Sequence, residues 1–141
     1  MKNKYFIIFL ILLFCFTITG CSGPTKYQKN IYDNDKLISS DSDSYYSTNI
    51  TDDNNKIEFS NFTGSYTIWK ENFNETFTID FSIQNYIEKG KNKIVLIKDN
   101  AIYKVITNIE EFDYNLEPGH YIIKIVGLNA EGSIKYNVKI K

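Results

Sequence analysis

The 141-residue chain contains no arginine, a single histidine and two cysteines, and each shortage excludes a class of site. All sixteen basic residues are lysines, so the planar guanidinium group that binds phosphate or carboxylate through two parallel hydrogen bonds is missing. With His120 as the single histidine, the usual zinc site built from several histidines is excluded. No cofactor is predicted from this composition.

Long apolar runs are confined to the N-terminus, where residues 5–16 form an unbroken apolar stretch after Lys2 and Lys4. As a helix this stretch would measure about 18 Å, well short of a hydrocarbon core of about 30 Å. A basic start, a short apolar run and an exit of small residues are typical of a secretory signal peptide. We therefore predict a signal peptide over residues 1–20, with an uncleaved anchor helix as the alternative.

The segment ends in Ile18-Thr19-Gly20-Cys21, which resembles the lipobox of bacterial lipoproteins. The resemblance implies that a diacylglyceryl group is attached to the Cys21 thiol, that the chain is cleaved before Cys21, and that the new α-amino group can also be acylated. Two or three acyl chains hold a protein on a membrane durably, whereas one gives marginal binding. Cys21 is thus the predicted lipidation site, the lipid membrane a predicted partner, and the extracytoplasmic face of the cell membrane the predicted location.

The remaining cysteine, Cys15, lies within the apolar run and would leave with the signal peptide. With Cys21 acylated, the mature chain would have neither a free thiol nor a disulfide. Thiol catalysis and cysteine-ligated zinc are then excluded, and a small extracytoplasmic domain would depend on its apolar core for stability.

After removal of residues 1–20, fourteen lysines stand against seventeen acidic residues, a net charge of −3. A charge this weak and evenly spread predicts no nucleic-acid partner. From Ser22 to Lys56 polar and acidic residues follow neither a period of 2 nor one of 3.6, so we predict a lipidated N-terminus and flexible linker over residues 21–56. Such a coil would span about 30–40 Å. Its six aspartates offer calcium ligands as an alternative, although the EF-hand spacing is absent.

From residue 57 onward, apolar and polar residues alternate. Phe77, Ile79, Phe81 and Ile83 share one parity, which is typical of a strand with one buried face. The stretch "KIVLIK" at residues 93–98, apolar without a break from 94 to 97, indicates a central strand covered on both sides. Helical spacing does not recur over a useful length. Residues 57–141 are therefore predicted to form an all-β domain, an antiparallel β-sandwich or jelly-roll-like fold.

Turn-forming residues divide this domain into about eight short predicted strands. The clearest breaks are at residues 89–92, 99–100, 117–120 and 129–132. The predicted strands cover residues 57–60, 62–70, 75–84, 93–98, 101–107, 110–115, 120–127 and 133–140.

Four blocks carry a second resemblance: "FTGSYTIW" at 62–69, "TFTIDFSI" at 76–83, "KIVLIKDN" at 93–100 and "LEPGHYIIKIVGLNAEGSIKYNVKI" at 116–140. In this order they resemble small β-sandwich lipoproteins of unknown function and, more distantly, bacterial pre-peptidase C-terminal-type domains. The resemblance covers residues 57–141 and implies an accessory or binding module that is not a catalyst. Asn92-Lys93 stands where the pre-peptidase type often has an acidic pair, so a calcium role is not carried over.

No combination of residues predicts catalysis. His120 follows the turn residues Pro118-Gly119 and has no cysteine available as a nucleophile, so it is interpreted as an exposed histidine. Glu110 and Glu111 are adjacent and would point to opposite sides of a strand. The chain is therefore predicted not to be an enzyme.

Trp69 is the candidate ligand-binding residue. It shares the parity of Thr63, Ser65 and Thr67, a face expected to be solvated, and a flat exposed aromatic ring can stack on a sugar ring. The alternative is a bulge near Gly64 or at the strand end that turns Trp69 into the core.

These observations predict a membrane-anchored, extracytoplasmic lipoprotein that acts as a non-catalytic binding or structural module for a protein or glycan partner. A glycan-binding module of the cell envelope is the first alternative. An envelope hydrolase or inhibitor is the second.

Overall fold

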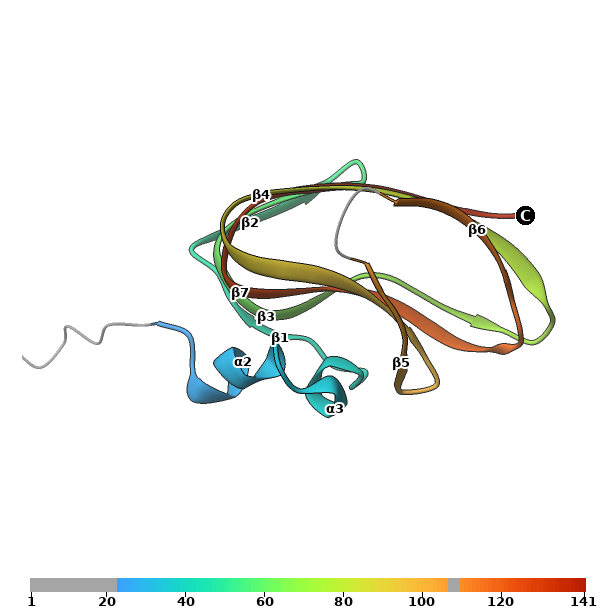
Figure 1. Ribbon diagram of the computed structural model, residues 1–141, viewed down its shortest axis with the longest axis horizontal. Helices are drawn as coiled ribbons and strands as arrows, with labels where there is room; N and C mark the ends of the chain where they lie inside the picture. Colours follow the sequence, from blue (N-terminus) through green and yellow to red (C-terminus); the bar gives the residue numbers. More distant parts are fainter. Residues whose placement is uncertain (1–22, 107–109) are drawn as a thin grey trace, which may run out of the picture.

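A computed structural model describes residues 23–106 and 110–141 and shows one antiparallel sheet of seven strands with two short helices (Figure 1). The helices are α2 (Lys26–Ile31) and α3 (Asp35–Ile38). The strands are β1 (Ser44–Tyr46), β2 (Asn49–Asp53), β3 (Lys56–Phe73), β4 (Phe77–Lys98), β5 (Ala101–Ile106), β6 (Glu110–Leu116) and β7 (Gly119–Ile140).

Three long strands, β3, β7 and β4, run side by side through the whole sheet, and each bends midway. On one side of the bend, the three long strands pair with β2 and β6 in the order β2-β3-β7-β4-β6. This half of the sheet forms the upper layer in Figure 1. On the other side of the bend, the long strands pair with β1 and β5 in the order β1-β3-β7-β4-β5, and this half forms the lower layer. The single sheet therefore folds over itself into a sandwich, and the predicted all-β class is confirmed.

The bends lie at residues whose backbone has positive φ: Asn61 (51°), Gly64 (124°), Gly90 (74°), Asn129 (49°) and Gly132 (156°). The strand registers shift at the same places, which marks β-bulges. At Gly90 a Cβ atom would lie 2.1 Å from the carbonyl oxygen of Asn129, so a side chain cannot be accommodated there. Bulges and glycine together turn each long strand from one layer into the other.

The predicted division into eight short strands is wrong at these bends. Residues 89–92 and 129–132, interpreted as turns, lie inside the continuous strands β4 and β7. Residues 57–60 and 62–70 likewise belong to one strand, β3. Glycine and asparagine adopt left-handed conformations both in turns and at bulges, so their presence does not say whether a strand ends or bends. The turns at Asn54-Asn55 and Asp99-Asn100 do close hairpins, with positive φ at both central residues of each.

The core between the two layers consists of the apolar side chains that point inward from the strands. It contains the four residues predicted from alternation, Phe77, Ile79, Phe81 and Ile83, and all four are buried. The other buried members are Ile57, Phe59, Phe62, Ile94, Leu96, Ile106, Leu116, Tyr121, Ile123, Ile125, Ala130 and Ile134.

A second apolar cluster lies on the opposite, outer face of the lower layer, between this layer and the helices α2 and α3. Val95 and Ile97 of β4 contact Ile31 and Ile38 of the helices there, whereas Ile94 and Leu96 face the central core. The apolar run at residues 94–97 is therefore covered on both sides, as its continuous apolar character predicts.

The predicted flexible linker is wrong over residues 25–53, which form both helices and the strands β1 and β2. Helix α2 begins with a complete capping box, in which Thr25 and Gln28 each bond the other's backbone N–H. Asn34 caps α3. Ile31 and Ile38 are buried, and this burial holds two helices that are too short to be stable alone. We call residues 25–43 the N-terminal clasp.

Candidate functional site

The outer face of the upper layer is polar, and no element of the described chain covers it. Cross-strand pairing places Tyr86, Ser133, Glu58 and Thr51 in one row across this face. Other rows contribute Gln84, Lys135, Lys56, Ser82, Asn137, Asp80, Lys139 and Thr78. We call this surface the polar face.

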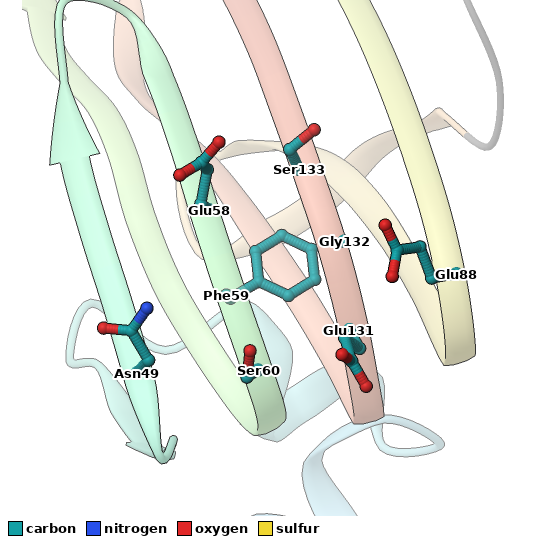
Figure 2. Close-up of a pocket in the computed structure, with 8 residues that line it drawn as sticks. All are labelled: Asn49, Glu58, Phe59, Ser60, Glu88, Glu131, Gly132 and Ser133. Atoms are coloured by element: carbon teal, nitrogen blue, oxygen red, sulfur yellow. The ribbon is translucent and has the colours of Figure 1, made fainter.

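A shallow hollow of about 260 Å³ opens on the polar face above Gly132. Figure 2 shows Glu58 on β3 and Glu88 on β4 at its two sides, with the β7 residues Glu131, Gly132 and Ser133 between them. The remaining lining residues are Asn49, Phe59 and Ser60. Gly132 has no side chain, and a Cβ atom there would lie 2.2 Å from the carbonyl oxygen of Tyr86 on the neighbouring strand β4. The hollow therefore lies where β7 bends and its backbone comes close to β4.

The lining of the hollow contains both hydrogen-bond donors and hydrogen-bond acceptors. Glu58 is ion-paired with Lys56, and Glu131 Oε2 lies 3.0 Å from Lys89 Nζ, so two of the three carboxylates already have a cationic neighbour. Ser60, Ser133 and Asn49 add hydroxyl and amide groups, which can both donate and accept. Neutral polar hydroxyls are the ligand groups that such a lining suits best.

Tyr86 is the most exposed large apolar or aromatic side chain of the described residues, at 63%. It pairs with Ser133, whose side chain lines the hollow, so both side chains stand on the same face of the sheet. The polar face therefore carries an exposed aromatic ring beside the polar hollow.

A second hollow, of about 480 Å³, lies at the β2–β3 hairpin on the same layer. It is lined by Asp53, Asn54, Asn55, Lys56, Lys135 and Tyr136. Lys56 and Lys135 are cross-strand partners, and Asp53 pairs with Lys56 from the other side, so the lining carries charges of both signs.

Trp69 does not stand on a solvated face. A register shift between Thr67 and Trp69 changes the parity of β3, and Trp69 then pairs with the inward-facing Ile123. Its side chain is half-buried, packs against the central core and stacks on Phe73 at a ring distance of 6.2 Å. Of the two orientations that the sequence left open, the bulge that turns the ring inward is the arrangement observed.

We expect the single tryptophan to report this packing in its fluorescence. Quenching by iodide should be at least about two-fold weaker in the folded protein than in the urea-unfolded chain, because the core and Phe73 shield the indole. Phe73→Ala should increase quenching in the folded state. Equal quenching in the folded and unfolded chains would contradict the inward orientation of Trp69.

His120 is held in a polar cluster and is not a free turn residue. Its Nδ1 lies 2.6 Å from Asn72 Oδ1, and its Nε2 lies 3.2 Å from Asp41 Oδ1. Asp41 also accepts two hydrogen bonds from Lys70 Nζ, at 2.7 and 2.8 Å. The hydrogen bonds from Lys70 and His120 lower the pKa of the Asp41 carboxyl. The histidine therefore ties β7 and β3 to the N-terminal clasp.

Lys124 is the second tie to the clasp, and it is fully buried. Its Nζ donates to the carbonyl oxygens of Ser40 (2.6 Å) and Ser42 (2.8 Å) and lies 3.5 Å from Asp43 Oδ1. Burial lowers the pKa of Lys124, and the Asp43 carboxylate partly offsets that effect. Asp43 also accepts hydrogen bonds from the backbone and side chain of Thr67. A buried ammonium group needs these acceptors, so the clasp and β7 depend on each other.

Three of the six aspartates considered as calcium ligands make other contacts. Asp41 and Asp43 hold the clasp, and Asp52 accepts a hydrogen bond of 2.8 Å from the Tyr66 hydroxyl. Among residues 23–106 and 110–141, no group of three or more acidic, histidine or cysteine side chains is arranged to hold a metal ion.

The predicted lipidation site, Cys21, and the predicted signal peptide lie outside the described residues. In the part of the chain that the structure describes, no helix has the length and apolar character needed to cross a bilayer. Both predictions therefore rest on the sequence.

No protein-family description, no characterised protein and no solved structure matches the chain. The resemblance to β-sandwich lipoproteins and to pre-peptidase C-terminal-type domains stays a prediction.

Sequence reasoning missed Tyr86 and the hollow beside it, although part of the signal was present. Tyr86 continues the outward parity of Ser82 and Gln84, so the alternation that identified the core of β4 also placed this ring outside. The hollow itself had no local signal, because it depends on Glu58, Glu88 and Glu131 from three separate strands.

Proposed function

We propose that this protein is a membrane-anchored, extracytoplasmic lipoprotein whose β-sandwich acts as a non-catalytic binding module. The observation that carries the proposal is the polar face, an uncovered sheet surface with an exposed tyrosine beside a polar hollow. Sheet faces of this kind can present fixed side chains to a partner because the long strands hold them in register. The lipobox at Cys21 supports the anchoring.

The non-catalytic part of the proposal is supported by the surroundings of the titratable residues. The side chain of His120 is engaged by Asn72 and Asp41, and two of the three carboxylates at the hollow are paired with lysines. General acid–base catalysis would need a carboxyl or imidazole group directed at a substrate position. These groups instead hold the fold together or balance nearby charge.

A glycan is the second candidate ligand, and Tyr86 favours it. An exposed aromatic ring offers a flat apolar surface for a sugar ring, and the carboxylate, amide and hydroxyl groups of the hollow can bond sugar hydroxyls. The hollow is smaller than the pockets of roughly 300–1,000 Å³ that enclose whole small ligands. It would fit one unit of an extended polysaccharide lying across the strands.

Tyr86→Ala is expected to abolish retention of the mature-length chain, residues 21–141, on cell-wall polysaccharide. Loss of the ring should reduce affinity at least about ten-fold, because aromatic anchors commonly contribute more than 1 kcal/mol to binding. Retention is measured by co-sedimentation with purified wall polysaccharide, and the melting temperature should barely change because Tyr86 is exposed.

Tyr103→Ala is the matched control, since Tyr103 is also exposed, at 51%, but lies on β5 of the lower layer. This variant should be retained like the wild type. Equal losses in both variants would argue against a specific site at Tyr86. No retention of the wild type would remove the glycan candidate and leave a protein partner for the polar face.

A further inference from the structure

The N-terminal clasp shortens the distance between the predicted lipid and the folded domain. Thr25, the N-cap of α2, is four residues after Cys21, and even a fully extended chain of that length spans about 14 Å at most. A flexible linker over residues 21–56 would have allowed about 30–40 Å and any orientation. The clasp removes that freedom because it is packed on the lower layer through Ile31, Ile38 and Lys124.

The clasp also fixes which side of the domain faces the anchor. The helices α2 and α3 cover the outer face of the lower layer, and the polar face is the outer face of the upper layer, on the other side of the sandwich (Figure 1). A chain attached to lipid just before α2 therefore has its lower layer near the bilayer and its polar face away from it.

The surface of α2 suits contact with anionic lipid headgroups. Lys26, Tyr27 and Lys29 are exposed, and the helix contains no acidic residue. Lysines near a negatively charged membrane contribute about 1 kcal/mol each, and their effect extends over a Debye length of about 10 Å at 0.1 M salt. Tyrosine is enriched at membrane interfaces because its ring is apolar and its hydroxyl is polar.

We infer that α2 docks the domain on the surface of the membrane that carries its lipid, with Lys26, Tyr27 and Lys29 in contact with anionic headgroups and the polar face directed away. The inference rests on the proposed anchoring at Cys21. It adds an orientation: the surface proposed to bind a partner is the one most accessible from outside the membrane.

The test uses tryptophan quenching by lipids that carry a nitroxide on the headgroup. Tyr27→Trp and Tyr86→Trp are each made in a Trp69→Phe background, so that each protein has one tryptophan. The mature chain is coupled through the Cys21 thiol to a maleimide lipid in phosphatidylglycerol vesicles. This chemical coupling supplies the anchor whether or not the cell acylates Cys21, so failure of the orientation and failure of the lipidation are separate results.

The tryptophan at position 27 is expected to be quenched at least about three-fold more strongly than that at position 86, because nitroxide quenching requires near contact and only α2 lies at the headgroups. Lys26→Glu with Lys29→Glu should then lower quenching at position 27 by reversing the attraction to phosphatidylglycerol. Equal quenching at the two positions, or stronger quenching at position 86, would overturn the orientation. Unchanged quenching in the double lysine variant would overturn the contact with anionic headgroups.

Discussion

Cys21→Ala is expected to abolish fatty-acid incorporation completely and to leave the precursor uncleaved before residue 21. The thiol of Cys21 is the predicted acceptor of the diacylglyceryl group, and alanine offers no nucleophile for it. Metabolic labelling with a clickable fatty acid, followed by gel electrophoresis and mass spectrometry of the N-terminus, measures both effects.

The chain supplies its own control in Cys15, which lies in the apolar run six residues earlier. Cys15→Ala should retain the label and the processed N-terminus, because residue 15 is removed with the signal peptide. Label that persists in Cys21→Ala, or that disappears in Cys15→Ala, would refute the assignment of Cys21 as the lipidation site.

Ile38→Ala is expected to cost about 2–5 kcal/mol in the free energy of unfolding, which is a large share of the stability of a small domain. Ile38 is fully buried against the outer face of the lower layer, although it belongs to a helix of four residues. Removing its side chain leaves a cavity beside Val95 and Ile97 and weakens the contact that closes the clasp over Lys124. Urea denaturation of residues 21–141 with Cys21→Ser, followed by circular dichroism, measures the change.

Tyr27→Ala is the matched control, because Tyr27 lies in the same clasp with half of its surface exposed. Its effect should stay within about 0.5 kcal/mol. Residues 57–141 alone should lack a cooperative transition, since that fragment loses β1 and β2 as well as the clasp. It also exposes the apolar outer face of the lower layer and leaves Lys124 without its acceptors. A fully stable fragment, or an Ile38→Ala variant as stable as the wild type, would show that the clasp is not part of the folded unit.

The positions of the strand residues in the core followed from alternation. Phe77, Ile79, Phe81 and Ile83 face inward as their common parity predicts, because successive side chains of a strand point to opposite sides whatever the strand pairs with. The continuous apolar run at residues 94–97 likewise indicated a strand covered on both sides, as is observed. Alternation in β4 also places Tyr86 on the outer face. Tyr86 is one of the two parts of the candidate site, and the hollow is the other.

Short polar segments were harder to interpret than strands. The clasp contains a threonine and glutamine at capping-box spacing and an asparagine before α3, and these were recognisable signals. They carry little weight alone because helices of six and four residues are not stable in isolation. Their stability comes from Ile31, Ile38 and the acceptors of Lys124, which lies more than eighty residues further along the chain.

Sequence alone was sufficient for the strand character of the domain, the inward residues of its core and the prediction of lipid attachment at Cys21, because each depends on a local pattern of residue types. The tertiary structure decided whether Gly90 and residues 129–132 end a strand or bend one, which way Trp69 points, and where the clasp packs. A bulge reverses the parity of all that follows it, and a bulge is set by pairing with a distant strand. The hollow beside Tyr86 has the same origin, since Glu58, Glu88 and Glu131 meet only after three bent strands are placed side by side.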